Sequence, residues 1–189
     1  MVLAVLTAAG CGNRTEPPAA PAETSADAQP GADLTTTPSK ALATNARGNL
    51  PKKIGEESGF SDREGGHFAT FKLTKIEKSA KCADASIKPS NGQFMVLTFE
   101  IATTAEFSTR STPSLFNPLD FSVLGLNGVA DTEVATPGTY GCRAAKKLPY
   151  NLAPSSKYVF EIVLDTKATS GAVQYRPPLA ADYGWEWQL

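Results

Sequence analysis

Apolar and polar side chains alternate with a period of two along six short stretches of this chain. The stretches are 68–76, 94–101, 119–126, 158–164, 172–175 and 183–189. In the second of them, Met95, Leu97 and Phe99 fall on one face, while Thr98 and Glu100 fall on the other. This is the pattern of a strand with one buried face. Gly, Pro, Asn and Ser clusters separate the stretches, so the sequence predicts an all-β, antiparallel sandwich or barrel. The β-sandwich is favoured, because two sheets are enough to bury the inward-facing aromatic residues.

Two connections can also be predicted. Asn127-Gly128 follows one of the alternating stretches, and this pair supplies the positive φ angles that a tight hairpin needs. The span from Thr103 to Pro118 is long and contains Pro113. We expect it to cross from one sheet of the sandwich to the other.

The alternation is absent from the first quarter of the chain. Residues 11–50 are rich in Pro, Ala, Thr and Ser, and every aromatic residue lies at or after Phe60. A segment of this composition cannot bury enough apolar surface to offset the entropy of ordering. The sequence therefore predicts a disordered, flexible tether over 11–50 and one folded domain over 51–189.

The chain begins with an apolar run that is broken only by Thr7 and ends in small residues before Cys11. This run resembles a bacterial lipoprotein signal, which implies a signal peptide over 1–10 and a lipid on Cys11. Ala8 stands where such signals carry Leu, and no basic residue precedes Arg14. We therefore expect the natural start to lie upstream. The alternative is a soluble protein with a free Cys11. Acyl chains would hold the protein at the outer face of the cell membrane.

Once Cys11 is assigned to the lipid, Cys82 and Cys142 remain. An even number of cysteines in an exported chain predicts a disulfide bond between them. A zinc site is the weaker alternative, because two thiols without further Cys or His neighbours do not complete the ligand set.

Charge and motifs exclude several function classes. Lys and Arg number 18 against 19 Asp and Glu, and the two signs are interspersed, whereas a nucleic-acid binder should carry a basic stripe. The chain has no nucleophile elbow, zinc-protease motif, phosphate loop or dinucleotide fingerprint. Its one histidine, His67, is interpreted as a loop residue. We expect no catalytic residues, no metal and no cofactor.

The last alternating stretch places Tyr183, Trp185 and Trp187 on one face. Burial in the core is the favoured interpretation, because large aromatic side chains stabilise a sandwich strongly when buried. The alternative is an exposed aromatic platform that binds a sugar or a peptide.

Four segments together resemble a known family: 48–56, 71–77, 91–101 and 183–187. They are similar to a family of domains of unknown function in lipoproteins of actinobacteria and other Gram-positive bacteria. That family is related to the immunoprotective extracellular antigen of mycobacteria. The resemblance implies an immunoglobulin-like β-sandwich and no settled activity.

These observations favour a lipid-anchored, extracytoplasmic binding module without catalysis, whose partner is an envelope protein or glycan. One alternative is an envelope glycan hydrolase with paired carboxylates. Another is a carrier that holds a small ligand between the sheets. The carboxylates available to the hydrolase are Glu100, Asp120, Asp131, Glu133, Glu161 and Asp165.

Overall fold

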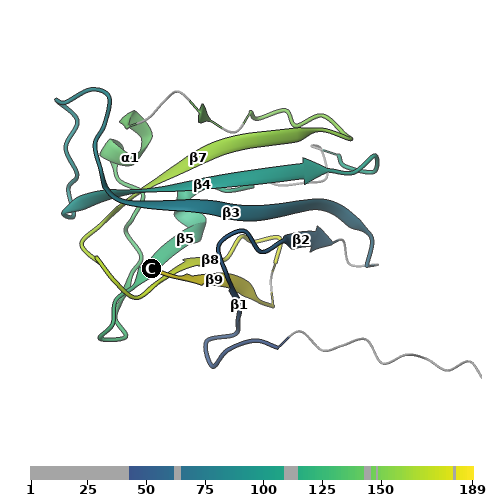
Figure 1. Ribbon diagram of the computed structural model, residues 1–189, viewed down its shortest axis with the longest axis horizontal. Coiled ribbons are helices and arrows are strands. Elements are labelled where there is room, and N and C mark those ends of the chain that lie inside the picture. Colours follow the sequence, from purple (N-terminus) through teal and green to yellow (C-terminus); the bar gives the residue numbers. More distant parts are fainter. Residues whose placement is uncertain (1–42, 62–64, 109–114, 143–145, 148, 181) are drawn as a thin grey trace, which may run out of the picture. The chain divides into compact units, whose positions relative to one another are not determined.

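The computed structural model describes residues 43–61, 65–108, 115–142, 146–147, 149–180 and 182–189. This part of the chain forms an all-β sandwich of two sheets, so the expected β-sandwich is confirmed (Figure 1). The expected signal peptide, Cys11 and most of the expected tether lie outside the described residues. Within the described ranges, no helix has the length and apolar character needed to cross a membrane.

The five-stranded sheet has the order β1-β9-β8-β5-β6. Its members are β1 (Asn49–Lys52), β9 (Gly184–Gln188), β8 (Ala172–Tyr175), β5 (Phe121–Leu124) and β6 (Ala130–Asp131). The four-stranded sheet has the order β2-β3-β4-β7. Its members are β2 (Ser58–Ser61), β3 (His67–Ala80), β4 (Gln93–Thr103) and β7 (Lys157–Thr166). The strand pairs are antiparallel, except that β1 runs parallel to β9.

The long alternating stretches are strands, and the structure adds elements too short to give a period. These are β1, β2, β6, a one-turn 3-10 helix η1 (Pro118–Asp120) and a short helix α1 (Pro137–Gly141). The start of the folded part also differs from the prediction. Asn49 and Leu50 are buried on the sandwich although the sequence pattern assigned them to the tether.

A bulge in β3 explains how this long strand keeps its apolar side chains on one face. The register shifts between Leu73 and Lys75, so Ile76 faces the core with Leu73 although three positions separate them. The hydroxyl of the intervening Thr74 donates to the carbonyl of Thr98, 3.0 Å away. The extra residue bends the strand without exposing its apolar face.

The core lies between the sheets and is dominated by aromatic rings. Phe71 packs edge-on against Trp185 with ring centroids 4.9 Å apart. Phe99 meets Trp187 at 5.9 Å, and Tyr175 stacks on Trp185 at 5.7 Å. Each such pair contributes about 1 kcal/mol beyond the burial of its apolar area. The aromatic rings therefore hold the two layers together.

The connection between β4 and β5 crosses from one sheet to the other, as predicted. Phe116 fixes its far end. This residue has a φ of 56°, and its backbone N–H donates to the buried hydroxyl of Tyr175 at 2.9 Å. Burial raises the pKa of the Tyr175 hydroxyl. The hydroxyl therefore stays protonated and acts as a fixed anchor for the crossing segment.

One close approach in the five-stranded sheet admits only glycine. Gly171 precedes β8 with a φ of +115°, and a Cβ added there would lie 1.9 Å from the carbonyl oxygen of Leu124. We expect Gly171→Ala to lower the free energy of unfolding by about 3 kcal/mol in urea denaturation. Gly55 is the matched control, because its φ is +84° with nothing within 4 Å. Gly55→Ala should cost only about 1 kcal/mol, and equal losses would contradict the close-approach argument.

Candidate functional site

Cys82 and Cys142 form the predicted disulfide, with Cα atoms 5.0 Å apart and a sequence separation of 60 residues. The bridge lies on the outer face of the four-stranded sheet. There Cys142 packs with Phe94, Val96 and Val163 in a second, smaller apolar cluster. Because Cys142 ends α1, the bridge fixes this helix and the segment after β3 to that face.

Trp185 and Trp187 do not form a platform. They are 1% and 0% exposed and face the core, so the interpretation as an exposed aromatic surface is wrong for both. Tyr183 is partly buried and contacts Trp185 edge-on at 5.4 Å. The physical reason is the alternation of β9, which turns both indoles toward the opposite sheet.

Four of the carboxylates considered for paired acid–base chemistry, Glu100, Glu161, Asp131 and Asp165, contact separate partners. Glu100 pairs with Lys72 across β3 and β4 at 3.0 Å, and Glu161 lies 3.9 Å from Lys146. Asp131 accepts from the hydroxyl of Thr166 at 2.9 Å. In the described part of the chain, no group of three or more His, Cys, Asp or Glu side chains could hold a metal ion.

Asp165 is a fully buried carboxylate at the end of β7. It accepts from the backbone N–H groups of Ser90 and Asn91 at 2.6 and 3.0 Å, and from the hydroxyl of Thr136 at 2.8 Å. These donors come from the β3–β4 connection and from the residue that precedes α1. Asp165 therefore fixes two connections on the outer face of the four-stranded sheet.

His67 has a polar neighbour that the sequence did not suggest. Its Nδ1 lies 2.9 Å from the hydroxyl oxygen of Ser61 in the exposed β2–β3 hairpin. A nucleophile of the triad type also needs a group that orients the base. None of the hydrogen bonds found for the described residues joins a carboxylate to this imidazole.

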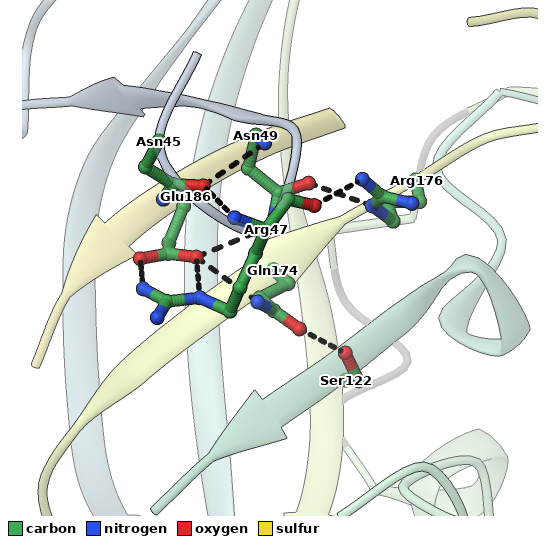
Figure 2. Close-up of polar contacts among 7 residues, drawn as sticks. All are labelled: Asn45, Arg47, Asn49, Ser122, Gln174, Arg176 and Glu186. Carbon is green, nitrogen blue, oxygen red and sulfur yellow. Dashed lines mark hydrogen bonds and ion pairs between the residues drawn. The ribbon is translucent and has the colours of Figure 1, made fainter. Parts of the chain in front are cut away.

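A cluster of connected polar contacts lies on the outer face of the five-stranded sheet (Figure 2). We call it the Glu186 network, and it consists of Asn45, Arg47, Asn49, Ser122, Gln174, Arg176 and Glu186. The strand register builds its base, because Ser122 lies opposite Gln174 and Gln174 lies opposite Glu186. The hydroxyl of Ser122 donates to Gln174 Oε1 at 3.0 Å.

Glu186 is 2% exposed and is surrounded by donors. Arg47 donates to both of its oxygens, through Nη2 to Oε1 and through Nε to Oε2 at 2.9 Å. Gln174 Nε2 and Asn49 Nδ2 also donate to Oε2, at 2.9 and 3.2 Å. Burial of the carboxyl raises its pKa, but the bonds from Arg47, Gln174 and Asn49 outweigh this and lower the pKa to about 2.

Arg176 joins the network through Asn49 and Arg47. Its Nε donates to Asn49 Oδ1 at 2.6 Å, and its Nη2 donates to the carbonyl of Arg47 at 2.7 Å. A Cβ at Gly184 would lie 2.4 Å from Arg176 Cγ. Glycine at this position therefore lets the arginine stem lie across the sheet.

This arrangement limits the chemistry of Glu186. An ionised carboxylate with a pKa of about 2 cannot serve as a general acid near neutral pH. Four donors already occupy its two oxygens. The network instead holds residues 45–49, and with them β1, on the edge of the sheet. No pattern in the sequence predicted this network, because Arg47 and Glu186 are 139 residues apart.

Removal of the Glu186 charge should destabilise the domain. In Glu186→Gln, the new amide N–H₂ faces the donors of Arg47 and Asn49, so we expect a loss of about 2 kcal/mol in urea denaturation at neutral pH. Glu100→Gln is the matched control, because its ion pair with Lys72 is exposed and should be worth less than about 1 kcal/mol. Equal effects of the two substitutions would contradict a structural role for the buried charge.

The stability difference between the wild type and Glu186→Gln should shrink in acid. The pKa of Glu186 is about 2 in the folded state against an ordinary value of 4.5, so the unfolded chain binds more protons between these values. The stabilisation by this group is therefore complete above about pH 5 and is lost as the pH falls toward 2. Denaturation curves across this range should show the wild type approaching Glu186→Gln. A constant gap down to the acid limit would contradict the lowered pKa.

The sequence matches no protein-family model and no curated protein. Among solved structures, the chain is similar to a secreted protein from Mycobacterium tuberculosis, MPT63, at 15% sequence identity. The match covers 75% of this chain and 98% of that one, with a TM-score of 0.48.

Proposed function

We propose that the protein is an extracytoplasmic binding module that a lipid on Cys11 holds at the outer face of the cell membrane. In this proposal residues 1–10 are a signal peptide, and the segment that follows is the tether. The β-sandwich contacts an envelope protein or glycan and performs no reaction on it. The observation that carries the proposal is that two of the three cysteines form a disulfide, whereas the third, Cys11, follows an apolar run.

The Cys82–Cys142 disulfide supports export. Bonds of this kind form and persist in oxidising compartments and are rare in the cytosol. Because these two cysteines pair with each other, Cys11 is the one that remains. It follows an apolar run that ends in Ala-Ala-Gly, which is the context of a lipid-bearing cysteine.

The Glu186 network supports a tethered arrangement. The tether would enter the domain at Asn45, whose side-chain oxygen accepts from the backbone N–H groups of Arg47 and Asn49 at 3.0 and 3.1 Å. Arg47 is then fixed to Glu186 on β9. A domain held from its N-terminal side needs its first strand secured, and these contacts secure it.

The engagement of the charged groups favours binding over catalysis. Glu186 is saturated by donors, Asp165 is buried among donors, and Glu100 and Glu161 lie beside lysines. Aromatic rings fill the space between the sheets, with Phe71 of the four-stranded sheet only 4.9 Å from Trp185 of the five-stranded sheet. This packing disfavours a small ligand carried between the layers.

The lipid can be tested directly on the protein expressed from its gene in a bacterium that processes lipoproteins. Mass spectrometry of the membrane-extracted protein should find an N-terminal Cys11 that carries a diacylglyceryl thioether. Cys11→Ser should abolish the lipid and release the protein from the membrane fraction. The double variant Cys82→Ser, Cys142→Ser is the control and should keep the lipid. A protein recovered with its opening methionine attached, and without lipid, would overturn the proposal.

A further inference from the structure

The chain contains two Asn-Gly pairs, Asn91-Gly92 and Asn127-Gly128, in opposite environments. In such a pair, the backbone nitrogen of the glycine can attack the side-chain carbonyl carbon of the asparagine. Glycine favours this attack because it has no side chain to shield the nitrogen and leaves the backbone free to rotate. Whether the reaction occurs in a folded protein depends on the contacts that restrain the asparagine side chain and the glycine nitrogen.

Asn127 lies at the tip of the β5–β6 hairpin, where residues 126–130 are exposed. Its Oδ1 accepts from the N–H of Val129 at 3.1 Å, which polarises the side-chain carbonyl. Gly128 donates to the carbonyl of Gly125 at 3.0 Å. Nothing lies within 4 Å of a Cβ placed on Gly128. An exposed turn opens at small free-energy cost, so this nitrogen can reach the carbonyl.

Asn91 is restrained by hydrogen bonds from its backbone N–H and from its side-chain amide. Its backbone N–H donates to Asp165 Oδ1 at 3.0 Å. Its Nδ2 donates to the carbonyls of Glu133 and Asp165 at 2.8 and 3.0 Å. Attack by Gly92 would expel the nitrogen that makes these two bonds. The acid formed would then face two carbonyls and the buried carboxylate of Asp165, which is unfavourable.

We propose that Asn127 is a site of spontaneous deamidation and isoaspartate formation, and that Asn91 is protected by its contacts. The nitrogen of Gly128 forms a bond to Cγ of Asn127, and the side-chain amide leaves as ammonia. The succinimide then adds one water. Cleavage on one side of the ring gives aspartate, and cleavage on the other gives isoaspartate. No oxidant or reductant takes part.

The modification would change the surface of the hairpin and leave the sandwich intact. It adds a negative charge beside two exposed aliphatic side chains, Leu126 (83% exposed) and Val129 (62% exposed). The isoaspartate product also lengthens the backbone at the tip by one carbon. Farther along the hairpin, Asp131 stays bonded to Thr166, so β6 keeps its place.

The test is incubation of the intact, disulfide-bonded protein at mildly alkaline pH. Peptide mapping by mass spectrometry measures the loss of ammonia and the gain of water, and an isoaspartate methyltransferase labels the isoaspartate. We expect deamidation at Asn127 to be at least about tenfold faster than at Asn91 in the folded protein, or about 1.4 kcal/mol in activation free energy. In the reduced chain in urea, the two asparagines should react at similar rates.

Asn127→Gln is the matched variant, because it keeps an amide but lengthens the side chain and disfavours the five-membered ring. It should remove the methyltransferase signal from the folded protein. Equal rates at the two asparagines in the folded protein would overturn the proposal. So would an Asn127 that stays intact in the folded protein while the unfolded chain reacts.

Discussion

The alternation of side chains along β9 is the constraint on which both layers of this protein depend. Trp185 and Trp187 enter the core and face the four-stranded sheet, so Glu186 between them must point to the opposite surface. Strands β1 and β8 lie on either side of β9, and the carboxylate is therefore enclosed by neighbouring side chains. A charge in that position requires hydrogen-bonding partners, and the start of the domain supplies them.

Two buried carboxylates fix chain segments on the two outer faces by different means. Glu186 is neutralised by the guanidinium of Arg47 and holds the segment that leads into β1. Asp165 accepts from backbone N–H groups and a hydroxyl, and it holds the segments that precede β4 and α1. Both residues lie on strands that also contribute to the core. The strand registers that pack the aromatic rings thus also place the polar anchors outside.

The charged groups of the sandwich and its exposed hairpin have different surroundings. The acidic side chains with defined contacts serve the fold, and the disulfide fastens α1 over the second apolar cluster. The exposed hairpin between β5 and β6 differs from these regions, because its asparagine and aliphatic side chains are open to solvent. Deamidation of this exposed hairpin would therefore leave the packing of the core unchanged.

The sequence by itself determined the long strands, the hairpin at Asn127-Gly128, the crossing after β4 and the pairing of Cys82 with Cys142. These features depend on a local period, on turn residues or on a count of cysteines. It did not determine β1, because four residues give no period and their composition resembles that of the tether. It also left two interpretations for Trp185 and Trp187, since a strand pattern shows which residues share a face and not which face is covered. Only the tertiary structure brought Arg47 to Glu186, because this contact depends on a parallel pairing between the first and last strands.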